Sequence, residues 1–239
     1  MDCDEDADTQ HIRVLPDTCV ELFVSYTNTP VAIIDNELHE RSIVTFRMSK
    51  PMDVQMRKGA GCLAICFHPG MAYLFFNTPM HVLANTVSTM DDLWNGMAAE
   101  IEDKLASVSN NTERVGIVQK HLLQHLANKK PNLLIEHCLK QVEASEGLIS
   151  LNRLSYNNGI SQRHLSRSFQ QCIGLSPKEY LRMARFLRSL TYVKRHTDLS
   201  FTEIAYKSGY YDQSHLNRDY KDYAGYTPGQ LVRARHLLY

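Results

Sequence analysis

Hydrophobic and polar residues follow two different patterns along this chain, and the pattern changes near residue 90. Before that point, short runs of β-branched and aromatic residues alternate with turn residues such as Thr29-Pro30 and Pro69-Gly70. The runs are VELFVSY (20–26), SIVTFRM (42–48), CLAICFH (62–68) and AYLFF (72–76). Short strands separated by turns predict a small β-barrel or β-sandwich with helices, so that the whole chain belongs to the α+β class.

From Asp91 onward, the apolar residues recur at helical spacing. Leu93, Met97, Ile101 and Leu105 repeat every four residues and predict one helix over residues 91–107, which we expect Trp94 to anchor to the β-region. A second helix is predicted over residues 112–128. Its apolar face contains Val115, Val118, Leu122, Leu123 and Leu126. The segment 129–132 contains Pro131, which predicts a break between a domain of residues 1–130 and one of residues 131–239.

The chain has a net charge of zero, but opposite charges lie on the two sides of this break. Residues 1–130 hold 11 Lys and Arg against 17 Asp and Glu, a net charge of −6, and residues 131–239 hold 15 against 9, a net charge of +6. No run approaches the 18 or so apolar residues of a membrane span, and the acidic N-terminus differs from a secretory signal. Six cysteines without CxxC spacing are typical of a reducing compartment. We expect a soluble cytoplasmic protein whose basic half faces a polyanion.

An internal repeat occupies the basic half. HLSRSFQQCIGLSP (164–177) and HLNRDYKDYAGYTP (215–228) share five of fourteen residues at a constant offset of 51. In each copy a short helix is expected to end at a glycine, Gly159 or Gly209, and the next helix to begin after a capping residue, Ser161 or Asp212. A helix, a tight turn and a second helix form a helix-turn-helix. The sequence therefore predicts two of these motifs, at about residues 151–171 and 201–223.

The second helix of each copy has one buried and one polar side. Leu165 with Phe169, and Leu216 with Tyr220, are spaced i and i+4 and predict the buried stripe. The other side carries residue types that bind base edges and phosphates in the major groove of DNA. These candidate DNA-binding residues are Gln162, Arg163, Ser166, Arg167 and Gln170 in the first copy, and Gln213, Ser214, Asn217, Arg218 and Lys221 in the second.

The segment 176–196 between the copies predicts one long helix, capped by Ser176 with Pro177 in its first turn. Its 21 residues would span about 30 Å, close to the roughly 34–36 Å between successive major-groove openings on one face of DNA. The cations of this segment would add attraction for phosphate; they are Arg182, Arg185, Arg188, Lys194 and Arg195.

Residues 147–234 resemble the DNA-binding domain of AraC/XylS-family transcription regulators. The resemblance rests on SQRHLSRSFQQCIGLSPKEYLRMAR and on FTEIAYKSGYYDQSHLNRDYKDYAGYTPGQL. It implies a sequence-specific transcription regulator of the bacterial cytoplasm and nucleoid, with promoter DNA as its partner. It also implies base contacts from Arg163, Ser166 and Arg167, and from Ser214, Asn217 and Arg218. Asp219, beside Arg218, is expected to neutralise part of the charge of that arginine.

The sequence of the acidic half, residues 1–130, gives a less specific indication of its role. AICFHPGMAYLFF and TVSTMDDLWNG are similar to the β-rich N-terminal region of some of these regulators, which implies a sensor or dimerisation role. A small-molecule effector and a second copy of the chain are then candidate partners, and RNA polymerase is another if the protein is an activator. The effector itself is not identified by these residues. Residues 131–239 alone are expected to fold and bind DNA.

An enzyme, or a redox or metal sensor, built on the N-terminal β-domain with a DNA-binding appendage is the alternative. His39, His68 and His81 lie in the strand region without further residues at ligand spacing, and His121 with His125 lack a completing carboxylate or cysteine. Cys62 and Cys66 would face one side of a strand and could form a thiol pair. We assign no catalytic residue, no metal site and no cofactor, and a nonspecific nucleoid protein remains a third hypothesis.

Overall fold

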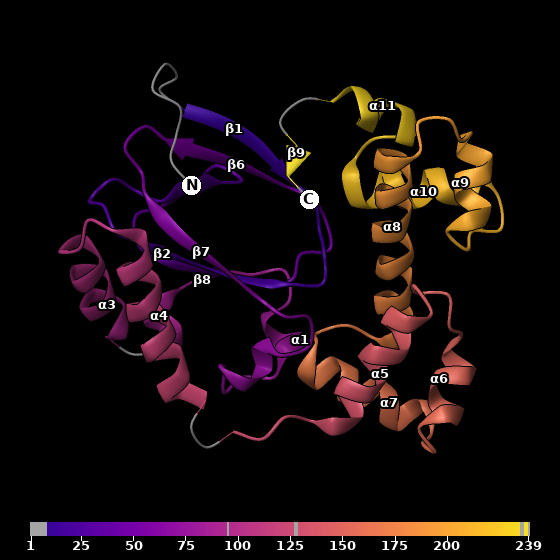
Figure 1. The fold of residues 1–239 in the computed structure, drawn as a ribbon, viewed down its shortest axis with the longest axis horizontal. Helices are drawn as coiled ribbons and strands as arrows, with labels where there is room; N and C mark the ends of the chain where they lie inside the picture. Colours follow the sequence, from indigo (N-terminus) through magenta and orange to yellow (C-terminus); the bar gives the residue numbers. More distant parts are fainter. Residues whose placement is uncertain (1–8, 95, 127–128, 235–236, 239) are drawn as a thin grey trace.

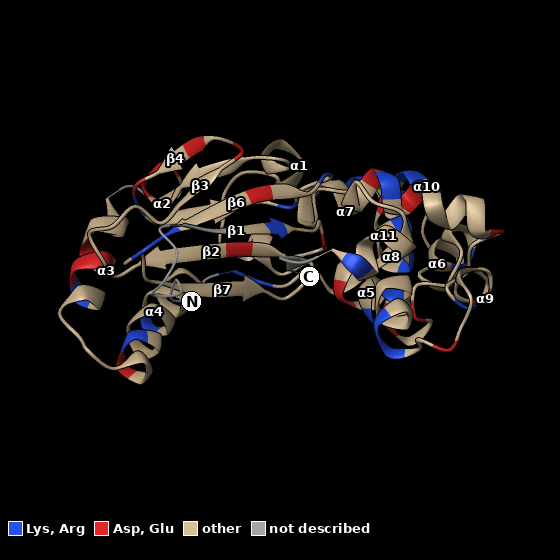
Figure 2. Cartoon of the chain, turned by 90° about the horizontal axis from the view of Figure 1, so that it is seen from above, with Lys and Arg blue, Asp and Glu red and all other residues tan. Residues whose placement is uncertain are grey.

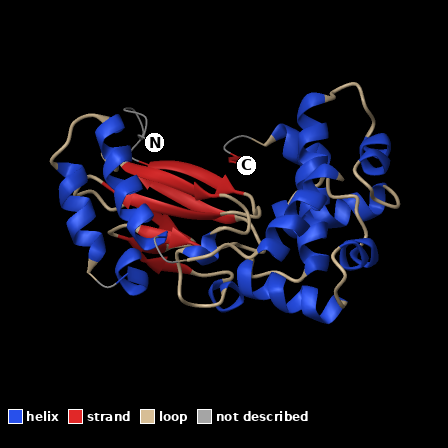
Figure 3. Ribbon diagram, turned by 60° about the horizontal axis from the view of Figure 1, so that its bottom comes forward, coloured by secondary structure: helices blue, strands red, loops and turns tan. Residues whose placement is uncertain are grey.

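The computed structural model describes residues 9–94, 96–126, 129–234 and 237–238. Its described strands form two sheets (Figures 1 and 3). The first sheet has the order β4-β3-β6-β1-β9 and the second the order β7-β2-β5-β8. The strands are β1 (Thr9–Val14), β2 (Val20–Ser25), β3 (Ala32–Ile34), β4 (Glu37–His39), β5 (Ile43–Thr45), β6 (Met52–Arg57), β7 (Cys62–Phe67), β8 (Val87–Thr89) and β9 (Leu237–Leu238).

The two sheets remain open, so the predicted sandwich is confirmed and a closed barrel is not found among the described strands. Closure would require the edge strands of the two sheets to pair, but β4 and β8 are only three residues long and each pairs on one side. Ile34 and Met52 of the first sheet pack against Ile43 and Cys62 of the second. This apolar layer fills the sandwich.

The other face of the second sheet is covered by helices α2 (Met90–Trp94), α3 (Met97–Ala106) and α4 (Asn111–Leu126). Figure 1 shows α3 and α4 beside this sheet. Leu22 and Val24 of β2 and Phe46 meet Ile101 and Leu105 of α3 in one core. Alternation along β2 explains this layering, because successive side chains of a strand point to opposite faces.

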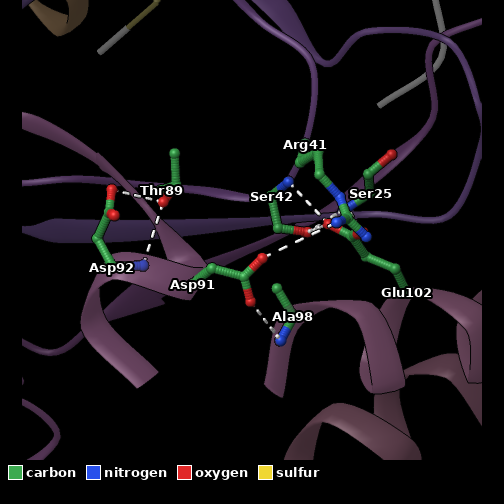
Figure 4. A network of polar contacts seen from close by, with 8 residues as sticks. All are labelled: Ser25, Arg41, Ser42, Thr89, Asp91, Asp92, Ala98 and Glu102. Carbon is green, nitrogen blue, oxygen red and sulfur yellow. Dashed lines mark hydrogen bonds and ion pairs between the residues drawn. The ribbon is translucent and has the colours of Figure 1, made fainter. Parts of the chain in front are cut away.

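The single helix predicted over residues 91–107 is divided into α2 and α3. Gly96 takes a left-handed conformation, with φ of 75°, which turns the chain before α3 begins. The carboxylate of Asp91 then accepts a hydrogen bond from the backbone nitrogen of Ala98 at 3.2 Å (Figure 4). The periodicity of apolar residues predicted one continuous helix because their spacing is the same before and after this turn.

Polar contacts attach α3 to the second sheet. Glu102 accepts hydrogen bonds from the backbone nitrogen of Ser42, at 2.9 Å, and from its hydroxyl, at 2.6 Å. The hydroxyl of Ser42 accepts one from the backbone nitrogen of Ser25, and Arg41 pairs with Glu102 (Figure 4). Trp94 stacks on Phe76 with ring centres 5.4 Å apart and donates to the carbonyl of Phe75, which confirms its anchoring role.

Helix α4 presents less of its predicted apolar face to the core than expected. Val118 is buried, whereas Val115 is 45% exposed and Leu123 is 64% exposed. The segment after α4 contains Lys129 to Asn132 and separates it from α5 (Leu133–Ala144), where the sequence predicted a break. The cap of α5 is the side chain of Asn132.

The C-terminal part is helical, with two helix pairs at the ends of one long helix (Figure 1). The first pair is α6 (Leu151–Asn157) and α7 (Gln162–Cys172), and the second is α9 (Phe201–Lys207) and α10 (Gln213–Ala224). Helix α8 (Pro177–Arg195) joins them, and α11 (Pro228–Arg233) follows. Within the described residues, no helix is both long and apolar enough to cross a membrane.

The N-terminal part contacts both helix pairs. Leu15 is 3% exposed and belongs to the core around α10, while Tyr73 of the 3-10 helix η1 (Ala72–Leu74) packs against the core around α7. Helix α1 (Met80–Leu83) lies against α7. Strand β9, after α11, pairs in parallel with β1, so the end of the chain returns to the first sheet.

One contact between the two parts depends on a glycine. Gly174 has a φ of +83°, and an added Cβ would lie 2.8 Å from the carbonyl oxygen of Met80 in α1. At Gly159, φ is also positive, but an added Cβ would meet no atom of the described residues within 4 Å. An alanine at Gly159 would therefore cause backbone strain alone. An alanine at Gly174 would cause the same strain and also a clash between the two parts of the chain.

We predict that Gly159→Ala lowers the free energy of unfolding by about 1–2 kcal/mol, the cost of a left-handed alanine. Gly174→Ala should lower it further, because the methyl group also forces α1 away from α7. Urea unfolding of both variants beside the unchanged protein measures the difference. Equal losses would mean that the Met80 contact adds nothing.

Candidate nucleic-acid interface

The first helix-turn-helix consists of α6 and α7, as the sequence predicted. Ser161 caps α7 by accepting a hydrogen bond from the backbone nitrogen of His164 at 3.2 Å. Leu165 and Phe169 are completely buried, which fixes the rotation of α7 about its axis. The opposite side of the helix therefore faces solvent.

The second motif, α9 and α10, repeats this construction. Asp212 caps α10 by accepting from the backbone nitrogen of His215 at 2.7 Å. Leu216 and Tyr220 are completely buried. Gly225 ends α10 in a left-handed conformation with φ of 76°.

The ten candidate DNA-binding residues all lie on α7 or α10, at positions that leave the polar side chains accessible. Seven are exposed, namely Gln162, Arg163, Arg167, Gln170, Ser214, Arg218 and Lys221, and three are half-buried, namely Ser166, Gln213 and Asn217. Among the described residues, Arg163, Arg167 and Arg218 pair with no carboxylate. These three guanidinium groups can therefore bind an external anion.

Helix α8 sets the distance between the two motifs. It has 19 residues, which corresponds to about 28 Å of helix. Ser176 and Glu179 form a capping box at its start, and Pro177 occupies the first turn, as predicted. Tyr180 and Leu181 pack in the core of the first motif, and Phe186 and Leu190 pack in that of the second. Both motifs are thus attached to one rigid element.

Two cations of α8, Arg182 and Arg188, form ion pairs inside the protein, so carboxylates of the chain compensate part of the charge that was expected to attract phosphate. Arg182 donates to Asp219 at 2.8 Å and also pairs with Asp222. Arg188 pairs with Glu146 at 2.9 Å. Lys and Arg are nevertheless frequent on the helices of this half, as Figure 2 shows.

Asp219 does not neutralise Arg218, contrary to the expectation from their adjacency. Its side chain is 1% exposed and turns toward α8, where it binds Arg182. Burial raises the pKa of the nearby Tyr210, and the charge of Asp219 raises that pKa further. Burial lowers the pKa of Arg182, but hydrogen bonds to Asp219 and Asp222 outweigh that effect and leave it raised.

The internal repeat carries one sign of this ion pair. Asp219 occupies the repeat position of Ser168, which is also buried, and a charged residue at a buried repeat position requires a partner. Arg182 is 37 residues away in the sequence, so only the packing of α10 on α8 brings the two together.

The thiol pair between Cys62 and Cys66 that the sequence suggested does not form. Cys62 is buried and Cys66 is exposed, and four residues of strand separate them by about 13 Å, too far for a disulfide. His121 lies near the amine of Lys104, and His125 near the sulfur of Met97. In the described part of the chain, no group of three or more His, Cys, Asp and Glu is placed to hold a metal ion.

The fold and this interface define a double helix-turn-helix domain joined to a β-sandwich. Residues 154–234 match the model of a family described as a helix-turn-helix domain, and residues 1–89 match a domain of unknown function, DUF6597. Over residues 154–234 the chain is therefore similar to a helix-turn-helix domain, in agreement with the predicted resemblance to AraC/XylS-family regulators.

The chain is similar to known proteins over part of its sequence, and by fold over most of its length. The transcriptional activator RhaS of Enterobacter sp. (strain 638) is 33% identical over 76 residues, which cover 32% of this chain and 27% of RhaS. RhaS of Salmonella arizonae is 33% identical over 79 residues, 33% of this chain and 28% of that protein. The chain thus matches little more than a quarter of the length of these relatives. The structure of ToxT from Vibrio cholerae covers 94% of this chain and 97% of its own, with a TM-score of 0.50 and 10% identity, and shows the fold alone.

The buried ion pair of α10 yields a prediction about stability. Asp219→Ala should lower the free energy of unfolding near the low end of the roughly 3–5 kcal/mol expected for a broken buried pair, since Arg182 keeps Asp222 and some solvent contact. Asp222→Ala, at a 51% exposed side chain, should cost less than about 1 kcal/mol. Urea unfolding tests both, and equal small losses would show that the buried pair contributes little.

Proposed function

We propose that the protein is a sequence-specific DNA-binding transcription regulator. In this proposal α7 and α10 enter two successive major-groove segments on one face of the duplex. The observation that carries it is the attachment of both recognition helices to the 19-residue helix α8, each with its buried stripe turned inward and its polar side outward. The net charge of +6 on residues 131–239 supports attraction to phosphate. The name of RhaS, an activator, supports a role in transcription.

We propose that residues 1–130 modulate the DNA-binding part, residues 131–239. Contacts of Leu15 and Met80 with the two motifs offer a physical route for this. A cavity of about 570 Å³ lies between the two parts, a size that suits a small-molecule effector. Its walls include Thr18 and His68 from the N-terminal part, and Val142, Tyr180, Leu187 and Arg195 from the helices.

A second copy of the chain is the further partner that we propose for the N-terminal part. The exposed Val115 and Leu123 lie eight residues apart on α4, on one face of the helix, and would be covered in a dimer. RNA polymerase would be a third partner if the protein acts as an activator, as the name of RhaS suggests.

The test of this function is selection of bound duplexes from a random pool by the full chain. We expect an enriched motif with two half-sites centred about 10 base pairs apart, one helical turn, because α8 holds the recognition helices at about that distance. Binding of all sequences alike, with strong salt dependence, would instead show a nonspecific nucleoid protein. A motif with a single half-site would refute simultaneous reading by both helices.

The guanidinium of Arg218 is available for DNA because Asp219 pairs with Arg182 instead. Arg167→Ala and Arg218→Ala should each weaken binding to the selected site by about 1–3 kcal/mol, since neither guanidinium pairs with a carboxylate of the described residues. Arg57→Ala, at an exposed position of β6, is the control and should leave affinity unchanged. Titration against the selected site and single-base variants at two salt concentrations distinguishes base from phosphate contacts. A normal affinity of Arg218→Ala would contradict the prediction.

A further inference from the structure

In each helix-turn-helix a side-chain hydrogen bond joins the same two positions of the two helices, although its direction differs between the copies. In the first motif, Nε2 of Gln162 donates to Oδ1 of Asn152 at 2.6 Å. In the second, the hydroxyl of Thr202 donates to Oε1 of Gln213 at 2.8 Å. Each glutamine is the first residue of its recognition helix, and each partner is the second residue of the preceding helix.

The two bonds form although the motifs differ around them. The glutamine follows its partner by ten residues in the first motif and by eleven in the second, where the turn is one residue longer. The partner is an amide in one copy and a hydroxyl in the other. The partner residues differ, but in each copy the bond holds a glutamine at the start of the recognition helix. The position of the glutamine amide is therefore what the two copies have in common.

Stability gives little reason for these bonds. Asn152, Gln162 and Thr202 are exposed, and Gln213 is half-buried. Water can replace an exposed hydrogen bond at small cost, while ordering a long side chain costs entropy. The bonds do hold the two amides at the N-termini of the recognition helices, the part of such a helix that contacts base edges in the major groove.

Each bond also leaves the base-reading groups of the glutamine available. An amide has two N–H donors and an oxygen with two lone pairs. Gln162 gives one N–H to Asn152 and retains the other together with its oxygen. Gln213 uses one lone pair for Thr202 and retains the second together with both N–H groups. An oxygen that accepts and an N–H that donates are the pair that binds N6 and N7 of adenine.

We propose that Gln162 and Gln213 each read an adenine, one in each half-site, and that Asn152 and Thr202 are positioning residues that hold the two amides for this contact. The proposal rests on the proposed function, because it names residues that would give the DNA site its sequence. Each glutamine side chain then loses less conformational entropy when DNA binds, because its hydrogen bond to the preceding helix has already restricted it.

The experiment uses the full chain and the motif that it selects. Gln213→Ala should reduce discrimination between A·T and the other base pairs at one position of one half-site, by about 5- to 150-fold. Thr202→Val removes the hydroxyl, keeps the shape of the side chain, and should reduce discrimination at that same position by about two- to tenfold. Thr202→Ser retains a hydroxyl and should restore it. Asn152→Ala and Gln162→Ala should behave in the same way at one position of the other half-site.

The matched control is Thr191→Val, which removes an exposed hydroxyl of α8 that donates to the carbonyl of Leu187. It should change no base preference. Thr202→Val made in the Gln213→Ala background should cause no further loss at the shared position, because the partner that it orients is gone. Melting temperatures should stay equal throughout, which separates positioning from a general structural role.

The outcomes distinguish this inference from the proposed function. If the full chain enriches no motif, the proposed function fails. If a motif is enriched but Gln213→Ala and Gln162→Ala weaken all sequences alike, the glutamines contact phosphate and the inference is wrong. It is also wrong if Thr202→Val and Asn152→Ala leave discrimination unchanged, or if Thr202→Ser fails to restore it.

Discussion

Helix α8 is the element on which the arrangement of the C-terminal half depends. Its 19 residues supply Tyr180 and Leu181 to one core and Phe186 and Leu190 to the other. A continuous helix has a fixed rise of about 1.5 Å per residue, so packing each motif on α8 also determines the distance and rotation between them. The capping box at Ser176 and Glu179 defines where this helix begins.

The two motifs are held to α8 by different means. The buried position of the repeat is occupied by the small Ser168 in the first motif and by Asp219 in the second. The charge of Asp219 is neutralised by Arg182. Removing one partner of a buried pair leaves a charge without compensation, so α10 is tied to α8 by a contact that α7 lacks. The two copies of the repeat therefore pack against α8 with different residues at the same position, a small serine in one and an ion-paired aspartate in the other.

The contacts between the sandwich and the helices couple the two parts of the chain. Leu15 completes the core beside α10, Gly174 approaches the backbone of Met80, and β9 extends the first sheet. These contacts reach both helix-turn-helix motifs rather than one. The proposed modulation by residues 1–130 would act through these contacts.

Much of this protein was determined by local sequence. Caps at Ser161, Asp212 and Ser176, glycines after the helices and the stripes of Leu165 and Leu216 are short-range features, and the structure confirms them. The ten outward positions on α7 and α10 followed from those stripes. Only tertiary structure decided the partners of Arg182 and Asp219, the turn at Gly96, the open sandwich and the bonds of Gln162 and Gln213. Each of these depends on which distant surfaces meet, and residue spacing along one element carries no information about its neighbour.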